Sequence, residues 1–240
     1  MADVHANLES LNAVIAAAMP FDRIWCLGDL VGYGPNPNEC VEIVRSFDHA
    51  VVAGNHDWVA SCKQSAAGFN PQAAIAARWT ATQLSAGARQ FLLDLPESAM
   101  EGDFLLVHGS PRAPTVEYLF RAEEAQRSFP HFTATYCLVG HTHVPCAFIA
   151  AGQSSSPDVI RIELKHDEPL PLDGWTRMIV NPGSVGQPRD YNPHAAFMVY
   201  DSIRRELQMQ RVPYDVAVTQ QKMRIANLPV PLIERLEFGI

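Results

Sequence analysis

Apolar and polar positions follow two patterns along the first half of the chain. After Asn7, apolar residues recur at the spacing of an amphipathic helix, and Pro20 ends that pattern. Short apolar runs are typical of strands that are buried on both faces. Strands are predicted for 24–27, 51–53, 104–107 and 136–139, and further helices from Asn36-Pro37 onward and through much of 58–95. Strands that alternate with helices predict an α/β fold with a parallel sheet covered on both faces.

The second half of the chain is richer in predicted strands. These strands are 146–150, 159–164, 178–180, 195–200 and 206–212, and two short helices follow at roughly 215–226 and 231–237. A hairpin turn is predicted for 153–157. We therefore expect a second sheet packed against the first. Because we find no repeat or low-complexity linker, we expect a single domain over 1–240 with a helical insertion at about 58–95.

Composition and charge narrow the class of protein. The 240 residues include 18 Lys and Arg against 26 Asp and Glu, a net charge of −8, and 48% are hydrophobic, which excludes a disordered chain. The negative charge argues against a nucleic-acid binder, although bound metal ions would still allow a small phosphorylated substrate. No apolar run reaches the roughly 20 residues of a membrane span. The 5 cysteines form no close pair and no signal peptide is evident, so we expect a reduced, cytoplasmic protein.

A polar cluster follows each buried strand of the first half. In α/β sheets, ligands bind at the carboxyl ends of the strands, so these clusters are expected at one edge. The side chains placed there are Asp29, Asn55, His56, His108, His141 and His143, joined by Asp3 and His5 before the first helix. Asp, Asn and His without cysteine suit divalent metals such as Mn, Fe, Zn or Co. Two ions that share a carboxylate would use the whole set.

Each cluster by itself also has a structural interpretation. A single histidine after a strand is commonly a hydrogen-bonded polar residue, and Gly28-Asp29 or Asn55-His56 could cap a helix. His141 and His143 lie two apart, so an extended segment would place them on one side. Clusters at five strand ends in one chain would need several coincidences. We therefore interpret them together as a metal centre.

These clusters resemble the motif blocks of the calcineurin-like metallophosphoesterases. The matching blocks are Asp3-Val4-His5, Gly28-Asp29, Gly54-Asn55-His56-Asp57, His108-Gly109 and Gly140-His141-Thr142-His143. The stretch from Asn181 to Val185 is similar to the small bacterial and archaeal phosphodiesterase branch of that family. The resemblance implies a four-layer α-β-β-α sandwich with a dinuclear site for Mn, Fe, Zn, Ni or Co.

Site roles follow from the resemblance residue by residue. The ligands implied for one ion are Asp3, His5, Asp29 and His143, and those for the other are Asp29, Asn55, His108 and His141, with Asp29 bridging. His56 matches a non-ligand histidine beside the substrate phosphate. The implied reaction is attack of a metal-activated hydroxide on phosphorus. Arg112 and Arg189 are each a candidate phosphate clamp or an exposed loop charge. The turn at Asn181 is expected to support the site.

The amino end departs from the family. Only Met1 and Ala2 precede Asp3, whereas a strand needs about five residues. We therefore expect a sandwich that lacks a full first strand. Either translation starts upstream of Met1, or the domain folds without this strand. In the second case a neighbouring strand would have an open edge, and the backbone that holds Asp3 and His5 would be slack.

The leading functional hypothesis is metal-dependent hydrolysis of phosphodiesters or small phosphorylated metabolites. A phosphomonoesterase and a dinucleoside polyphosphate hydrolase are alternatives. The second usually carries Asp-Arg-Gly after the Gly-Asp block, where this chain has Leu30 to Gly34. A non-catalytic scaffold with the same fold is a further alternative, which the presence of His56 and every ligand disfavours. The sequence does not predict the oligomeric state, and no membrane partner is expected.

Overall fold

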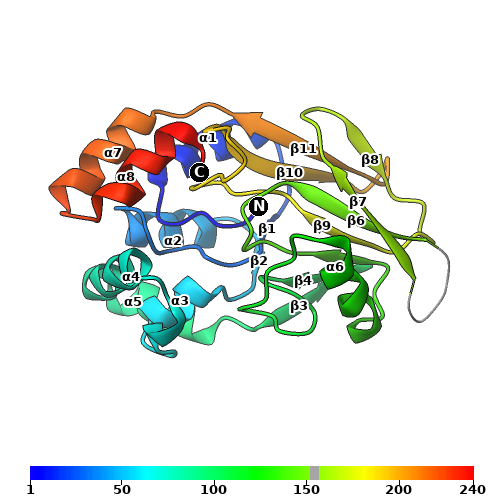
Figure 1. Ribbon diagram of the computed structural model, residues 1–240. Coiled ribbons are helices and arrows are strands. Elements are labelled where there is room, and N and C mark those ends of the chain that lie inside the picture. Colours follow the sequence, from blue (N-terminus) through cyan, green and yellow to red (C-terminus); the bar gives the residue numbers. More distant parts are fainter. Residues whose placement is uncertain (152–156) are drawn as a thin grey trace.

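In the computed structural model, two layers of β-sheet lie face to face and helices cover their outer sides (Figure 1). The structure describes residues 1–151 and 157–240, so most of the turn predicted for 153–157 lies outside the described residues. The helices are α1 (Leu8–Ala18), α2 (Pro37–Arg45), α3 (Asn55–Ala60), α4 (Pro71–Gln83), α5 (Ala86–Asp94), α6 (Ala122–Ser128), α7 (Val216–Ile225) and α8 (Val230–Phe238). None of these helices has the length and hydropathy that crossing a membrane requires.

The helix starts follow the capping signals in the sequence. The side chain of Asn7 accepts a hydrogen bond from Ser10 N at the start of α1, and Asn70 does the same for Ala73 N at the start of α4. Pro37 and Pro71 occupy the first turns of α2 and α4, where the missing N–H has no helical partner to lose. The predicted starts of these helices are confirmed.

The strands form one six-stranded mixed sheet and two smaller sheets, of two and three strands. They are β1 (Ile24–Cys26), β2 (His49–Val51), β3 (Ser98–Glu101), β4 (Phe104–Val107), β5 (Tyr136–Leu138), β6 (Cys146–Ala151), β7 (Asp158–Glu163), β8 (Pro169–Pro171), β9 (Met178–Asn181), β10 (Ala195–Asp201) and β11 (Glu206–Val212). The six-stranded sheet has the order β3-β4-β5-β9-β6-β7, and β4, β5 and β9 are parallel. The other sheets are parallel β1-β2 and antiparallel β10-β11-β8.

Two expectations about the strands are corrected. The strands of the first half do not form one parallel sheet, because β1-β2 and β4-β5 belong to different sheets. Helices α3 to α5 carry the chain from one sheet to the other, and apolar runs do not encode that choice. In addition, β2 ends at Val51, two residues before the predicted end, because Ala53 N donates to Pro96 O outside the sheet. The short elements β3, β8 and α6 were not predicted.

Three apolar clusters separate the layers. Leu11 and Val14 of α1 pack with Ile24 of β1 and Phe197 of β10, under the first helical layer. A second cluster, which includes Leu106 and Val180, fills the space between the sheets. The third lies between the six-stranded sheet and α6, and includes Phe129, Phe148 and Ile179. The order of layers is therefore α-β-β-α, as the resemblance implied.

The described residues contain no assigned strand before α1, but Met1 still pairs with the end of β1. The Met1 ammonium donates to Trp25 O at 2.8 Å, and Leu27 N donates to Met1 O at 2.9 Å. The chain then turns through Asp3 toward the carboxyl ends of β1 and β2. This short contact begins the path that brings the first polar block to the others.

Candidate metal centre

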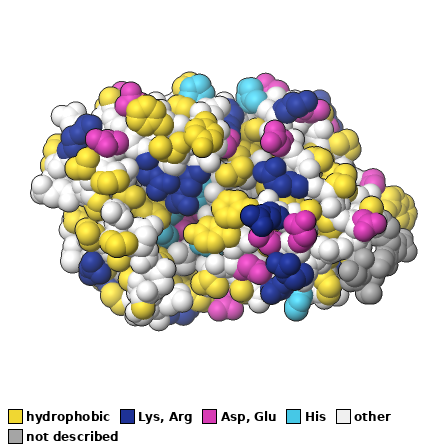
Figure 2. All heavy atoms as spheres, in the orientation of Figure 1, with side chains coloured by type: hydrophobic (Ala, Val, Ile, Leu, Met, Phe, Trp, Pro, Cys, Tyr) yellow, Lys and Arg dark blue, Asp and Glu magenta, His cyan; other side chains and the backbone are white. Residues whose placement is uncertain are grey.

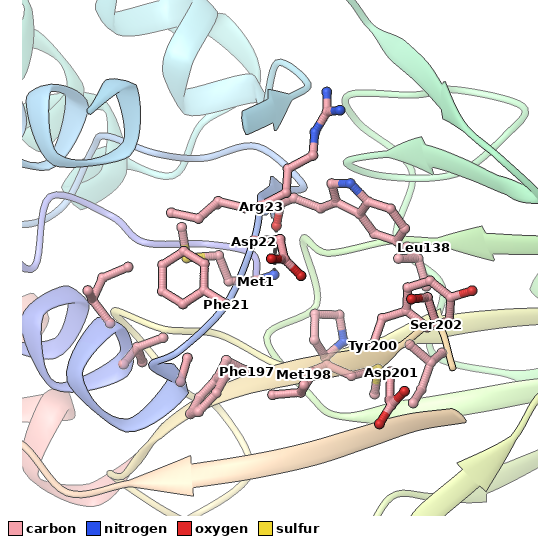
Figure 3. Close-up of a pocket in the computed structure, with 18 of the residues that line it drawn as sticks. Met1, Phe21, Asp22, Arg23, Leu138, Phe197, Met198, Tyr200, Asp201 and Ser202 are labelled. Carbon is pink, nitrogen blue, oxygen red and sulfur yellow. Dashed lines mark hydrogen bonds between the residues drawn. The ribbon is translucent and has the colours of Figure 1, made fainter. Parts of the chain in front are cut away.

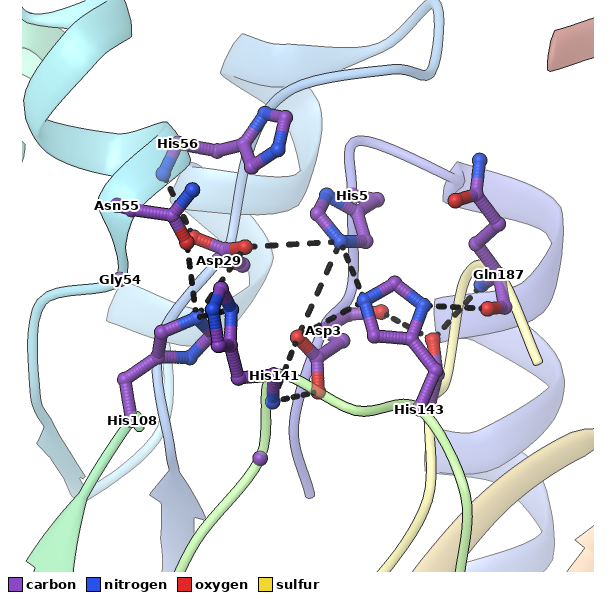
Figure 4. A network of polar contacts seen from close by, with 12 residues as sticks. Asp3, His5, Asp29, Gly54, Asn55, His56, His108, His141, His143 and Gln187 are labelled. Carbon is purple, nitrogen blue, oxygen red and sulfur yellow. Dashed lines mark hydrogen bonds and ion pairs between the residues drawn. The ribbon is translucent and has the colours of Figure 1, made fainter. Parts of the chain in front are cut away.

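The polar clusters converge in a buried site at the carboxyl ends of strands from both sheets (Figure 4). Two groups of side chains each bring their potential ligand atoms within 4.8 Å of one another. The first group is Asp3, His5 and His143, and the second is Asp29, His108 and His141. All six side chains are buried.

Asp29 lies between the two groups. Its Oδ2 atom is 3.4 Å from His108 Nε2 in its own group and 3.7 Å from His5 Nε2 in the other. The second carboxylate oxygen, Oδ1, accepts from the backbone N–H of His56 at 2.8 Å. Asn55 extends the second group, because its Oδ1 atom is 3.1 Å from His108 Nε2. One carboxylate oxygen therefore faces both groups, as a bridging ligand would.

The orientation of the side chains in the first group favours the binding of a cation. His5 Nδ1 lies 3.2 Å from Val31 O, and His143 Nδ1 lies 2.6 Å from Gln187 O. A carbonyl oxygen only accepts, so in each ring the proton is on Nδ1 and the neutral Nε2 carries a lone pair. These two Nε2 atoms are 3.2 Å apart. Two facing lone pairs repel unless a positive ion lies between them, and a divalent metal fits this donor set.

The second group has the same chemistry. His108 Nδ1 donates to Leu27 O at 2.8 Å, so in the neutral ring Nε2 has a lone pair that faces the oxygens of Asn55 and Asp29. Burial opposes a charge on His108, but the Asp29 carboxylate outweighs burial and raises the pKa of His108 to about 9. The carboxylate thus favours a positive charge at this position. A divalent ion would supply it and leave the imidazole neutral.

The other histidines of the site are held in the neutral, ligand-competent form. Burial lowers the pKa of His5, His56, His141 and His143, and for His56 it lowers the pKa to about 4. The Asp29 carboxyl remains ionised although burial opposes its charge, because His108 and His56 hold its pKa well below the usual range. Neutral imidazoles around an ionised carboxylate are the protonation states that metal binding needs.

The backbone of the site is strained at most of these residues. The φ angles are 54° at Asp3, 49° at His5, 52° at Asp29, 67° at His141 and 63° at His143, all in the left-handed region. Non-glycine residues are uncommon there, and such strain typically costs about 1–3 kcal/mol per residue. Strain of this kind clusters at functional sites, where surrounding contacts hold it in place.

The backbone conformation contradicts the expectation that His141 and His143 lie on one side of an extended segment. Both residues adopt left-handed conformations instead. The two rings diverge, so that His141 joins Asp29 and His143 joins Asp3 (Figure 4). A single tight turn thus serves both groups.

The backbone around Asp3 and His5 is also not slack, contrary to expectation. Asp3 N donates to Gly28 O at 3.1 Å and His5 N to Asp29 O at 2.9 Å, which ties the segment to the loop after β1. On the other side, Ser184 Oγ donates to Asp3 O at 2.8 Å. Loops on both sides therefore replace the constraint that a preceding strand would have supplied.

Asn181 and Gly54 position these loops. Asn181 Nδ2 donates to Gly140 O at 2.6 Å and to Thr142 Oγ1 at 3.0 Å, and so fixes the turn that carries the two divergent histidines. This agrees with the supporting role expected of the Asn181 turn. A Cβ at Gly54 would lie 2.0 Å from Asp29 Oδ1, so only glycine allows α3 to begin against that carboxylate.

The two arginine candidates differ in their surroundings. Arg112 forms an ion pair with Glu117 at 3.6 Å, and one third of its side chain is exposed (33%). The guanidinium of Arg189 lies 5.9 Å from the centroid of the Tyr33 ring. The pKa of His143 is lowered mainly by its own burial and, next, by the charge of Arg189. The structure therefore places Arg189 beside the histidines.

Two aromatic residues at the site were missed. The Tyr118 ring stacks on His141, with 3.8 Å between centroids and 16° between planes, and Tyr33 contacts His56 at 4.3 Å. No local pattern marks either residue. Figure 2 shows a hollow near the centre of this face, in which histidine and acidic side chains are visible between basic and hydrophobic ones.

Comparison with known proteins agrees with this geometry. Residues 1–203 match the calcineurin-like phosphoesterase superfamily domain. The chain belongs to this superfamily. It is therefore a metallophosphoesterase, a hydrolase of phosphoric esters, with two candidate groups of metal ligands.

Two of the relatives extend over the whole chain. A metallophosphoesterase structure from Sphaerobacter thermophilus has 43% sequence identity and a TM-score of 0.89, and the match covers 100% of this chain and 97% of that one. An uncharacterized protein of Methanocaldococcus jannaschii is 36% identical over 246 residues, covering 100% of this chain and 96% of that protein. A symmetrical bis(5'-nucleosyl)-tetraphosphatase of Chromohalobacter salexigens is 42% identical over 55 residues, which are 22% of this chain and 20% of that protein.

Proposed function

We propose that the protein hydrolyses phosphodiesters or small phosphorylated metabolites at a dinuclear metal site. The observation that carries the proposal is the pair of buried donor groups that face each other across one oxygen of Asp29. The proposed ligands of one ion are Asp3, His5, Asp29 and His143, and those of the other are Asp29, Asn55, His108 and His141. When bound, such ions polarise a phosphoryl oxygen and lower the pKa of water.

His56 is the proposed catalytic residue that does not bind metal. It begins α3 beside Asn55, its backbone N–H is fixed by Asp29, and its ring lies between Tyr33 and Phe69, 4.3 and 4.5 Å from their centroids. Its Nδ1 atom is buried without a hydrogen-bond partner in the described part of the chain. A ring held so firmly can donate an N–H to the oxygen that becomes negative as the ester bond breaks.

Arg189 is the better supported of the two arginines for phosphate binding. It lies beside Tyr33 and its charge lowers the pKa of His143, whereas Arg112 forms an ion pair with Glu117. A planar guanidinium can hold two phosphate oxygens at once. Replacing Arg189 is expected to raise KM more than replacing Arg112.

A substrate with a flat group is favoured by the aromatic residues beside the site. Tyr118 stacks on His141, lies 5.5 Å from the Phe120 ring and is 44% exposed. An exposed aromatic face can stack with a nucleobase or an aryl group. This favours nucleoside phosphate esters among the small substrates. A dinucleoside polyphosphate also contains nucleobases, so it is one of the substrates to be tested.

The test is a turnover screen with protein freed of metal by a chelator and then loaded with Mn²⁺, Fe²⁺, Zn²⁺, Ni²⁺ or Co²⁺. Its substrates are an aryl diester, an aryl monoester, a cyclic nucleotide and a dinucleoside tetraphosphate. We expect turnover only with metal, and faster for diesters than for monoesters. Asp29→Ala should lose activity and metal at both positions, whereas His166→Ala, a change of an exposed histidine, should behave as the parent protein.

Two results would contradict the proposal. Full activity of Asp29→Ala would exclude a shared ligand. A protein that binds two metals per chain and turns over none of these substrates would favour the scaffold alternative.

A further inference from the structure

A large cavity lies between β1 and β10, and none of the candidate metal ligands lines it (Figure 3). It has a volume of about 460 Å³, and apolar residues such as Ile15 and Trp25 form much of its lining. Of the described residues in this lining, the only arginine is Arg23, which already forms an ion pair with Glu101 at 3.1 Å. This cavity therefore offers no free guanidinium to a charged substrate, in contrast to the wall of the metal centre that contains Arg189.

Arg189 lies beside the first metal group without a carboxylate partner. Its backbone N–H donates to His143 O at 3.3 Å, and its guanidinium lies 5.9 Å from the centroid of the Tyr33 ring. The neighbouring carboxylate, Asp190, forms an ion pair with Arg211 instead. No other Asp or Glu side chain of the described residues forms an ion pair with Arg189. Its positive charge is therefore left for a ligand.

The amide of Gln187 adds a second donor that lacks an acceptor. Its Oε1 atom accepts from Arg189 at 2.9 Å, which fixes the orientation of the amide because a guanidinium only donates. Gln187 Nε2 and Arg189 Nε are then buried without a hydrogen-bond partner among the described residues, and Gln187 is only 1% exposed. Figure 4 shows the Gln187 side chain continuing past His143, on the side where the His5 ring lies. Because buried donors without an acceptor are costly, this wall favours a ligand rich in oxygen atoms.

A second arginine, Arg235, lies on α8 beside the same wall. One turn after it, Gly239 O accepts from Tyr191 N at 2.8 Å, which holds the end of α8 against the loop that carries Arg189. Figure 2 shows Lys or Arg side chains next to one another at the rim of the central hollow, in the region where α8 ends in Figure 1. The fold thus brings two arginines together from segments far apart in the sequence.

The two guanidinium groups are near enough for their charges to interact. Burial and, next, the charge of Arg189 lower the pKa of Arg235 to about 10. Arg235 Nε donates to Ile240 O, and its two terminal nitrogens form no hydrogen bond with the described residues. Two positive groups at one wall repel each other, and a phosphate chain that accepts from both would remove this repulsion.

We propose that Arg235 binds a second phosphate of the substrate, joined to the phosphate that Arg189 holds at the metal centre. This inference rests on the proposed function, in which the reacting phosphate lies beside Arg189. It narrows the substrate class to nucleotides with a chain of at least two phosphates, in preference to cyclic nucleotides and simple diesters. The nucleobase keeps its proposed place on Tyr118.

The first test measures whether an added phosphate increases affinity. AMP and ADP, which differ by one phosphate, are compared as inhibitors of aryl diester turnover by the protein loaded with Mn²⁺, with Mn²⁺ in excess over the nucleotide. We expect ADP to bind about ten- to hundredfold more tightly than AMP, because hydrogen bonds to charged groups contribute on that order. Equal inhibition constants for AMP and ADP would overturn the proposal.

Variants on α8 and α7 assign the effect to one side chain. Arg235→Gln should bring the ratio of the AMP and ADP inhibition constants close to one, and Arg235→Lys, which keeps the charge, should retain part of the ratio. Arg224→Gln, the matched change of an exposed arginine on α7, should keep the ratio of the parent protein. Loss of AMP and ADP affinity by the same factor in Arg235→Gln would show that Arg235 supports the fold and does not bind a second phosphate.

Direct binding separates this inference from the proposed function. Calorimetric titration of AMP and ADP into the protein loaded with Mn²⁺ needs no turnover. If no ester is hydrolysed but ADP binds more tightly than AMP only when Arg235 is present, the proposed function fails and the second phosphate site stands. If esters are hydrolysed but Arg235→Gln leaves the preference for ADP unchanged, the second phosphate site is refuted and the proposed function stands.

Discussion

At the scale of single residues, the site depends on which ring nitrogen carries the proton. Carbonyl oxygens of Leu27, Val31 and Gln187 accept from Nδ1 of His108, His5 and His143, and so turn each Nε2 toward the neighbouring ligands. Leu27 and Val31 belong to the loop after β1, and Gln187 belongs to a loop far from it in the sequence. Because these carbonyls set the tautomer, the ligand strength of each imidazole depends on backbone groups that are not themselves candidate ligands.

His56→Ala tests catalysis apart from metal binding. The variant should keep its metal content, since no ligand group includes the ring. Groups that donate a proton or hydrogen bond in the transition state contribute about 10²–10⁴-fold, so kcat should fall by that range for an alkoxide leaving group. The loss should be smaller for nitrophenolate, which hardly needs the proton. Metal analysis and steady-state kinetics measure both effects, and loss of metal would show that His56 is a ligand.

The cysteines provide a second test at this scale. All five thiols are free, and only Cys62 is exposed. Burial raises the pKa of Cys26 to about 12, so its thiolate is scarce at neutral pH. We expect a thiol reagent to modify Cys62 in the native protein and the other four only after unfolding, as intact-mass measurements would show. Rapid native modification of Cys26 would contradict its placement in the core.

At the scale of elements, the loops after the strands carry the chemistry and the strands hold them. Asn181 at the end of β9 fixes the turn after β5, and Ser184 in the next loop fixes Asp3. The turn after β5 contributes one histidine to each metal group. A change in one such loop should therefore act on both groups.

Asn181→Ala and Asn70→Ala form a matched pair. Asn70 caps α4, and loss of a cap typically costs about 1 kcal/mol, which lowers the Tm of a chain of this size by roughly 2–4 °C. Asn181→Ala leaves buried groups near His141 without partners, typically at about 1–3 kcal/mol, and should also weaken metal binding. Calorimetry and metal titration compare the two. Unchanged metal affinity in Asn181→Ala would mean that other contacts suffice to hold the turn.

At the scale of the whole molecule, the candidate metal centre lies where the two sheet layers meet. Asp29 and Asn55 follow β1 and β2 in one sheet, whereas His108 and His141 follow β4 and β5 in the other. Ions bound between them would link both sheets across the central apolar layer. Metal binding should therefore stabilise the fold as well as supply the chemistry.

Metal removal tests this coupling. A ligand that binds only the native state stabilises it by about 2.7 kcal/mol at one hundred times its Kd, which corresponds to a rise in Tm of roughly 5–10 °C. We expect a chelator to lower the Tm of the parent protein by about that amount. In Asp29→Ala the chelator should have little effect. An identical Tm with and without metal in the parent protein would argue against ions that bridge the sheets.

Sequence patterns determined the helix starts, most of the buried strands and the identity of the side chains in the metal groups. These features depend on neighbours along the chain, such as Asn7 before α1 or Gly28-Asp29 after β1, so spacing reveals them. The short edge strands β3 and β8 carry little apolar signal, because their side chains are largely exposed, and they were missed.

Only the tertiary structure decided how these parts meet. It separated β1-β2 from β4-β5, turned His141 and His143 toward different groups, and placed Arg189 rather than Arg112 beside the histidines. It also showed that the contacts of Asp3 with Gly28 and Ser184 hold a segment that lacks its strand. The physical reason is common to all of these: each depends on hydrogen bonds and packing between residues far apart in sequence, which local periodicity does not record.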